Sequence, residues 1–134
     1  MKKILVVDDK KNVRISLSIG LKREGYQVDV ASDALEAIMK MKMTGYDVLL
    51  SDVRMPVISG IELANKVTKL YPHVLTILMS AYDFNEVEKG DQKLSAYPKL
   101  SKPFEMTELL NLLSPEMSHS DLQQEISDLA TIAQ

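Results

Sequence analysis

Short apolar runs that each end near a polar residue recur along this chain. The runs are Ile4–Val7, Val28–Ala31, Val48–Leu50 and Val74–Met79, and a fifth is expected near Tyr97–Ser101. Unbroken apolar runs of this length are typical of strands buried on both faces, as parallel strands are. The chain is therefore constrained to a fold in which a parallel sheet is covered on both sides.

The segments between these runs have helical periodicity. Val13, Leu17 and Leu21 recur at every fourth position and are followed by Gly25, a plausible helix stop. An apolar residue at every fourth position forms one face of an amphipathic helix. Two further segments also have helical spacing: 34–41 has apolar residues at positions 34, 37, 38 and 41, and 61–70 has them at every third position. A final helix is expected over about 105–113. Strands that alternate with helices predict an α/β fold with a doubly wound, five-stranded parallel sheet, a three-layer sandwich.

Two local features refine this expectation. Asp33 and Glu36 have the spacing of a capping box, which predicts that a helix begins directly after Asp33. Residues 83–95 make a poor helix, because their apolar positions are few and Gly90 lies in the middle, where glycine costs about 1 kcal/mol relative to alanine. This fourth helix is expected to be short or frayed.

The 134 residues suit one domain, which we expect over 1–114, followed by a tail or linker over 115–134. Ser114-Pro115 ends the last helix of the domain, and Asp121 is a candidate cap for a helix in the tail with a narrow apolar stripe. The apolar positions of this stripe are Leu122, Ile126, Leu129 and Ile132. This stripe would pair with a copy of itself, dock on the domain, or lead into an output domain, and a linker remnant is the interpretation we favour.

Composition excludes several classes of protein. There is no cysteine for a disulfide framework or a thiolate zinc site, and no apolar stretch of the roughly 20 residues that span a bilayer. A net charge of −3 provides no basic surface for nucleic acid. We therefore expect a cytoplasmic protein without membrane insertion or direct nucleic-acid binding.

Polar side chains gather where the predicted strands end. Asp8 and Asp9 follow the first strand, Asp52 ends the third, Ser80 ends the fourth, and Lys102 follows the fifth. The carboxyl ends of the strands in an open parallel sheet line one crevice. We therefore expect three carboxylates, a hydroxyl and an ammonium group in one pocket.

Three carboxylates in one pocket repel each other unless a cation neutralises them. Oxygen ligands without histidine or cysteine favour a hard ion such as Mg²⁺. Asp9 and Asp52 are the expected direct ligands, the backbone carbonyl of Arg54 is a third, and Asp8 would act through water. The sequence therefore predicts a magnesium site.

A carboxylate beside Mg²⁺ is also a competent nucleophile toward phosphorus. Asp52 is the expected phosphoryl acceptor, Lys102 would pair with the phosphoryl oxygens, and Ser80 would donate a hydrogen bond to one of them. Taken singly, each residue has a simpler explanation: an aspartate at a strand end is usually a cap or turn residue, and Asp8 or Asp9 would serve to cap the first helix. Their shared position at one sheet edge favours the phosphoryl-acceptor interpretation.

These motifs resemble the receiver domain of bacterial two-component response regulators. The resemblance rests on Asp8-Asp9, on Asp52 with Met55-Pro56 and Gly60, on Ser80-Ala81 and on Lys102-Pro103-Phe104, and it covers residues 1 to about 114. Residues 50–56 resemble most the receivers of the nitrogen-regulatory transcription factor type. The resemblance implies a (βα)5 flavodoxin-like receiver fold.

The resemblance also implies roles and partners. Asp52 would be phosphorylated by a sensor histidine kinase or a phosphotransferase, Asp8 and Asp9 would serve Mg²⁺, Ser80 would be the switch hydroxyl, and Lys102 would sense the phosphate. The kinase would meet the first helix and the loops around the pocket. An output domain or second receiver would meet the fourth helix, fifth strand and fifth helix.

One position departs from the family. Lys99 stands where most members have an aromatic residue that swings inward when the hydroxyl moves toward phosphate. An ammonium group is not readily buried in the apolar slot that an aromatic ring would occupy. We therefore hypothesise that signalling works through ordering of residues 81–95 rather than through an aromatic rotamer. Tyr97, on the same face of the strand, and Tyr82 are candidate substitutes. Arg54 and Tyr82 would also flank the phosphoryl group and slow its hydrolysis.

Three other functions remain open. An aspartyl-phosphate hydrolase needs an acid two residues after the nucleophile, where this chain has Arg54. A nucleotide-binding module needs a glycine-rich phosphate loop, and neither common motif occurs in the sequence. A degenerate receiver, acting as a phosphate-independent interaction module, is favoured only by Lys99. We expect a signalling switch rather than an enzyme, with no activity beyond its own phosphorylation and slow dephosphorylation.

Overall fold

The computed structural model describes residues 2–81 and 96–114. The chain divides into two compact units, Met1–Pro103 and Phe104–Gln134. The first unit contains five strands and three described helices, and the second contains one described helix. The predicted fourth helix, Tyr82 and the tail after residue 114 lie outside the described residues.

The five strands form one parallel sheet with the order β2-β1-β3-β4-β5. Their bounds are β1 Lys3–Val7, β2 Gln27–Ala31, β3 Val48–Asp52, β4 Leu75–Ser80 and β5 Lys99–Ser101. The register pairs Val7 with Ser51 and Asp52 with Met79, so the strands end near one edge. This order is one of the two common doubly wound orders, and its switch point lies between β1 and β3.

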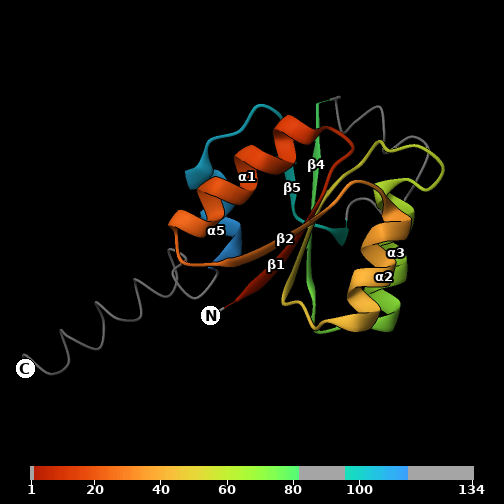
Figure 1. Cartoon of the computed structure of the whole chain (residues 1–134). Coiled ribbons are helices and arrows are strands. Elements are labelled where there is room, and N and C mark those ends of the chain that lie inside the picture. Colours follow the sequence, from red (N-terminus) through yellow and green to blue (C-terminus); the bar gives the residue numbers. More distant parts are fainter. Residues whose placement is uncertain (1, 82–95, 115–134) are drawn as a thin grey trace, which may run out of the picture. The chain divides into compact units, whose positions relative to one another are not determined.

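Helices cover both faces of this sheet, as the sequence predicted. α1 (Lys11–Arg23) lies on one face, and α2 (Ala34–Met43) and α3 (Gly60–Leu70) lie side by side on the other (Figure 1). The sheet and its two helical layers form the predicted three-layer sandwich.

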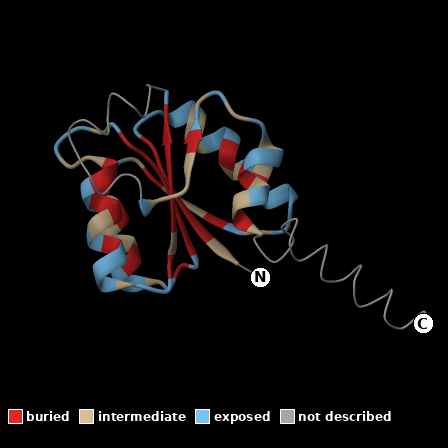
Figure 2. Cartoon of the chain, turned by 180° about the vertical axis from the view of Figure 1, so that it is seen from behind, coloured by how far each residue is buried: buried red, intermediate tan, exposed pale blue. Residues whose placement is uncertain are grey.

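The core lies between the sheet and its helices. All five residues of β3 are buried, and Figure 2 shows buried residues along the strands and on the inner sides of the helices. One cluster joins β1, α2, β3 and α3 through Leu5, Met41, Leu49 and Leu63, which are at most 5% exposed. This core holds the β1 and β3 ends in place.

The helix starts show how local sequence sets the boundaries. The Asp33 carboxylate accepts a hydrogen bond from the Glu36 amide at 2.8 Å, which caps α2 as predicted. The reciprocal half differs: the Glu36 carboxylate accepts from the backbone amide and hydroxyl of Ser32 rather than from Asp33. Ser59 caps α3 through the Glu62 amide at 3.2 Å.

The described helix of the second unit is α5, Met106–Leu113. At its start the Glu105 amide donates to the Glu108 carboxylate at 3.3 Å. This interaction satisfies one of the amides that a helix start leaves unpaired. The helix lies where the sequence predicted it.

Candidate functional site

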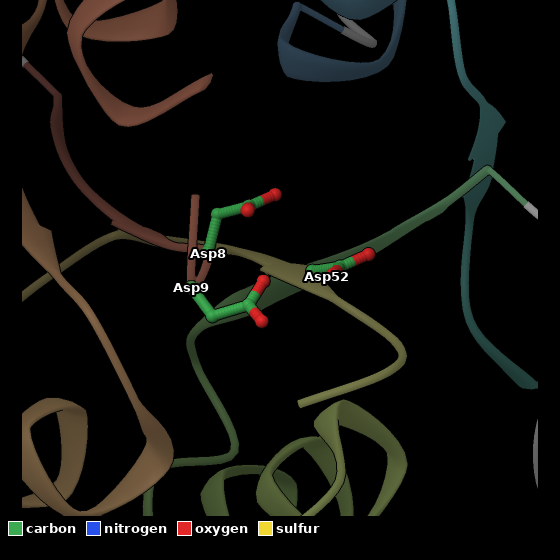
Figure 3. A group of neighbouring side chains, drawn as sticks. All are labelled: Asp8, Asp9 and Asp52. Carbon is green, nitrogen blue, oxygen red and sulfur yellow. The ribbon is translucent and has the colours of Figure 1, made fainter. Parts of the chain in front are cut away.

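Three carboxylates meet at the switch point of the sheet. Asp8 and Asp9 follow β1, and Asp52 is the last residue of β3 (Figure 3). One carboxylate oxygen from each lies within 4.8 Å of the others. Asp8 and Asp52 are buried and Asp9 is exposed, so the cluster opens toward solvent on the Asp9 side. The structure thus brings the predicted acidic residues together.

Lys102 also lies in this cluster, although it is 94 residues from Asp8 in the sequence. Its Nζ donates to Asp8 Oδ2 at 2.6 Å and lies 3.4 Å from Asp52 Oδ1. The Lys102 side chain is 15% exposed, and those of Asp8 and Asp52 are 0% and 11% exposed. Charges removed from water to this extent need a partner of opposite sign, and Lys102 is that partner for both carboxylates.

The charge state of Asp52 reflects this environment. Burial raises the pKa of the Asp52 carboxyl; the nearby Lys102 ammonium opposes this shift, and the negative charge of Asp8 reinforces it. The result is a net rise in pKa. Because the charged form of this carboxylate is disfavoured by burial, any additional cation at the site would stabilise that charged form.

Ser80 and Arg54 occupy different environments. Ser80, the last residue of β4, is 1% exposed, and its carbonyl accepts from the Lys102 amide at 2.7 Å. The ends of β4 and β5 are therefore linked beside Asp52. Arg54 is exposed in the loop after β3.

Gly60 fixes the backbone of Asp52. Its amide donates to the Val53 carbonyl at 2.8 Å. A Cβ atom at this position would lie 1.9 Å from the Asp52 carbonyl oxygen and 2.9 Å from the Val53 Cα. Gly60 belongs to the sequence motif, but the motif alone does not reveal this contact. A glycine that opens the helix following a polar strand end is the signal for such a close approach, even with the loop of residues 53–59 between them.

Tyr97 is held against α3. Its hydroxyl donates to Asn65 Oδ1 at 2.6 Å, and its ring packs against a cluster that includes Val53 and Leu78. Lys99 pairs in register with Leu78, and its Nζ donates to the Tyr97 carbonyl at 3.2 Å. The aromatic side chain of Tyr97, two residues before Lys99, is thus anchored in a packed cluster.

A cavity of about 190 Å³ adjoins the acidic cluster. Asp9, residues 32–35 and residues 56–58 line it. Val57, in this lining, is 91% exposed and has φ of +69°. A β-branched residue rarely adopts a left-handed conformation, so the loop after Asp52 carries local backbone strain.

The donor set fits a hard divalent cation. The three carboxylates provide oxygen ligands within reach of one ion, and among the residues that the structure describes the Lys102 ammonium is the one cation paired with them, which leaves excess negative charge. Oxygen-only donors are those that Mg²⁺ prefers. The residues present therefore suit the predicted metal.

Comparison with known proteins identifies the family. Residues 4–114 match the response regulator receiver domain. The chain belongs to this family. Receiver domains are signalling domains rather than classical enzymes, and this receiver domain is a homologue of response regulators of two-component systems.

Three relatives illustrate the match. Sporulation initiation phosphotransferase F of Bacillus subtilis is 31% identical over 107 residues, which cover 80% of this chain and 86% of that protein. The DNA-binding transcriptional regulator NtrC of Proteus hauseri is 29% identical over 131 residues, which cover 98% of this chain but 28% of NtrC. The chain thus spans about a quarter of this longer relative.

The third relative is known by structure. Response regulator TrrA of Thermotoga maritima, in complex with Mg²⁺-BeF, superposes with a TM-score of 0.77 at 35% identity, covering 86% of this chain and 98% of TrrA. TrrA has also been solved with histidine kinase ThkA, and there it matches with a TM-score of 0.76 over 88% of this chain and 100% of TrrA. The predicted family, including its nitrogen-regulatory relatives, is confirmed. Within the part of the chain that is described, no helix is long and apolar enough to cross a membrane.

Proposed function

We propose that Asp52 accepts a phosphoryl group from a phosphohistidine donor and that this receiver domain is a phosphorylation-dependent switch. The observation that carries the proposal is the position of Lys102, whose Nζ lies 2.6 Å from Asp8 and 3.4 Å from Asp52. One cation that already contacts the acceptor carboxylate is in place to pair with a phosphoryl group formed there. The TrrA structure with a beryllium fluoride and Mg²⁺ supports the same assignment by homology.

The transfer itself exchanges one bond for another. A carboxylate oxygen of Asp52 attacks phosphorus, the phosphorus–nitrogen bond to the donor imidazole breaks, and the imidazole nitrogen keeps the electron pair and takes up a proton. The nucleophile must be ionised for this step, and Lys102 helps to keep it so. Positioning and charge stabilisation account for most of the catalysis in such transfers.

Asp9 and Asp52 would hold Mg²⁺ directly with the backbone carbonyl of Arg54, and Asp8 would act through water. When bound, the ion would neutralise charge on the transferring group. Asp9 is the exposed member of the carboxylate cluster, which suits a ligand that meets a solvated ion. Asp8 is buried and already paired with Lys102, which suits an indirect role.

Ser80 and Lys102 would read the product. The Lys102 amide donates to the Ser80 carbonyl, so a displacement of the lysine backbone is transmitted to the end of β4. The Ser80 hydroxyl would donate to a phosphoryl oxygen. Because the Tyr97 hydroxyl is hydrogen-bonded to Asn65, an inward swing of the Tyr97 ring would break a part-buried hydrogen bond. Signalling through residues 81–95 therefore stays our preferred route, although that segment is outside the described residues.

The phosphodonor would dock on α1 and the surrounding loops. Ile15 and Ile19 are 47% and 49% exposed on α1, and a groove beside them is lined by Lys11 and Arg14. An apolar strip flanked by basic side chains suits a helix with apolar and acidic residues. The partner would be a sensor histidine kinase or a phosphotransferase of the cytoplasm, and the TrrA complex with ThkA is in keeping with this.

The remaining assignments concern the rest of the chain. Residues 1–114 would form the receiver domain and residues 115–134 a tail or linker. An output domain or second receiver would use the fourth helix, β5 and α5. NtrC, which extends well beyond the matched region, supports such an arrangement.

Intact-mass measurement after incubation with acetyl phosphate and Mg²⁺ tests the proposal. We expect a gain of one phosphoryl group that disappears in Asp52→Asn and in EDTA. Asp33→Asn is the matched control, because Asp33 is an exposed acid that caps α2 outside the carboxylate cluster. A chain that binds Mg²⁺ and gains no phosphoryl group from acetyl phosphate or from phosphohistidine donors would be a phosphate-independent interaction module.

A further inference from the structure

One surface on the α2 side gathers exposed apolar side chains. Leu35, Met39 and Met43 on α2 and Val57 in the loop after β3 are 57%, 65%, 84% and 91% exposed. We refer to these four residues as the α2 patch. Large apolar side chains gathered on one surface are typical of an interaction site.

The patch is a continuous stripe on the outer side of the helix. Leu35, Met39 and Met43 are spaced four residues apart, so they lie above one another on one face. The core-facing side of the same helix is formed by Ala34, Ala37 and Met41. Leu35 and Val57 line one cavity, which extends the stripe to the loop after β3.

Charge along α2 is divided between its ends. Asp33 is the N-cap and Glu36 lies in the first turn, and Lys40 and Lys42 lie in the last turn. Lys40 is 3.3 Å from Glu36 within the helix, and its Nζ also donates to the Val30 carbonyl. Asp33 and Lys42 are the exposed members of these four, so the apolar stripe has an acidic residue at its start and a basic residue at its end.

We propose that the α2 patch binds the α2 patch of a second copy of this chain, with the two helices antiparallel and the two-fold axis near Met39. An antiparallel arrangement brings the acidic end of each helix against the basic end of the other, and it also opposes the two helix dipoles. A parallel arrangement would bring like charges together. Met39 would contact its own counterpart, and Leu35 would contact Met43 of the second copy.

Self-association is favoured over a different partner because the patch carries both complementary halves itself. A surface that recognises itself across a two-fold axis needs this internal complementarity. The contact is built on a single helix of ten residues and one loop residue. Interfaces below about 1,200 Å² are weak or transient, so the dimer forms in a concentration-dependent equilibrium.

Cysteine cross-linking tests the two-fold axis directly, because the chain has no cysteine of its own. In Met39→Cys the two thiols would meet across the axis. Ile19→Cys is the control, because Ile19 is similarly exposed but lies on α1, on the opposite face of the sheet. We expect Met39→Cys to form disulfide-linked dimers at least tenfold faster than Ile19→Cys under mild oxidation, and sedimentation of the unmodified chain to show mass rising from 15.0 kDa toward twice that value.

A charge-exchange experiment completes the test. Met39→Glu and Met39→Lys should each be monomeric, and a mixture of the two should associate again. Circular dichroism checks that each variant is folded. A sedimentation mass that stays at 15.0 kDa up to millimolar concentration, or equal cross-linking rates at residues 39 and 19, would overturn the proposal.

Discussion

Gly60→Ala tests how the fold positions the phosphoryl acceptor. The added Cβ would lie 1.9 Å from the Asp52 carbonyl oxygen, whereas real Cβ contacts are essentially never below 3.0 Å. Either the start of α3 or the end of β3 must therefore move by about 1 Å. The hydrogen bond from the Gly60 amide to the Val53 carbonyl lies in the path of that movement.

The expected cost follows from three effects. Overpacking of a tight contact costs about 1–3 kcal/mol, and a lost backbone hydrogen bond costs about 1 kcal/mol. Replacing glycine by alanine in a helix returns about 1 kcal/mol through higher helix propensity. We therefore expect the free energy of unfolding to fall by about 2 kcal/mol.

The site should suffer as well as the fold. A displacement of about 1 Å in a reacting group reduces rates by about 100-fold in well-organised sites. We expect Gly60→Ala to be phosphorylated on Asp52 by acetyl phosphate 10- to 100-fold more slowly, by the same reasoning. Urea denaturation gives the stability, and the time course of intact mass gives the rate.

Gly45→Ala is the matched control. A Cβ at Gly45 would meet nothing within 4 Å, and its backbone is compatible with alanine. Gly45→Ala should leave the phosphorylation rate unchanged and stabilise the fold by up to about 1 kcal/mol through a less flexible unfolded chain. The reasoning is refuted if Gly60→Ala matches Gly45→Ala in both stability and rate.

Three further substitutions probe the site and its loop. Asp52→Asn should raise the free energy of unfolding at pH 7 without divalent cations, because the pKa of Asp52 is raised in the folded state. The charged Asp52 destabilises the fold fully above the raised pKa and not at all below the ordinary value of 3.8, so the gain in stability from Asp52→Asn should shrink between pH 7 and pH 3. Urea titrations at the two pH values measure this gain, and an equal gain at both would contradict the prediction. Lys102→Met should destabilise the fold by about 3 kcal/mol, because it leaves the buried Asp8 carboxylate without its cationic partner. Adding Asp8→Asn should recover most of the lost stability in chemical denaturation, and a double variant that shows no recovery would point to lost packing instead. Val57→Gly should stabilise the fold by about 0.5–1 kcal/mol, because glycine adopts the positive φ without strain and the almost fully exposed Val57 side chain contributes little packing. A loss of stability in the same assay would show that the loop is unstrained.

Much of the fold was predictable because its signals are local. Apolar runs locate the strands within one or two residues, and Asp33 marks the start of α2 as observed. The polar residues at the predicted strand ends also predicted the site, because the carboxyl ends of parallel strands lie at one edge of the sheet. Asp8, Asp9 and Asp52 meet there for this reason.

Other features depend on contacts that spacing does not encode. The Lys102–Asp8 pair joins residues 94 positions apart, and only the packing of β5 against β4 shows which carboxylate the lysine approaches most closely. The bond from Tyr97 to Asn65 likewise depends on how β5 lies against α3. The capping-box spacing predicted that the Glu36 carboxylate would accept from the Asp33 amide. Instead it accepts from Ser32, whose amide and hydroxyl both donate to the same Glu36 oxygen.

The most direct test of the account is to locate the phosphoryl group. After incubation with acetyl phosphate and Mg²⁺, borohydride reduction converts an aspartyl phosphate into homoserine, and peptide sequencing by mass spectrometry then identifies the position. We predict homoserine at residue 52 and at no other aspartate. Homoserine at residue 8 or 9 with residue 52 unmodified would contradict the assignment of Asp52 as the acceptor and of Lys102 as the cation that reads it.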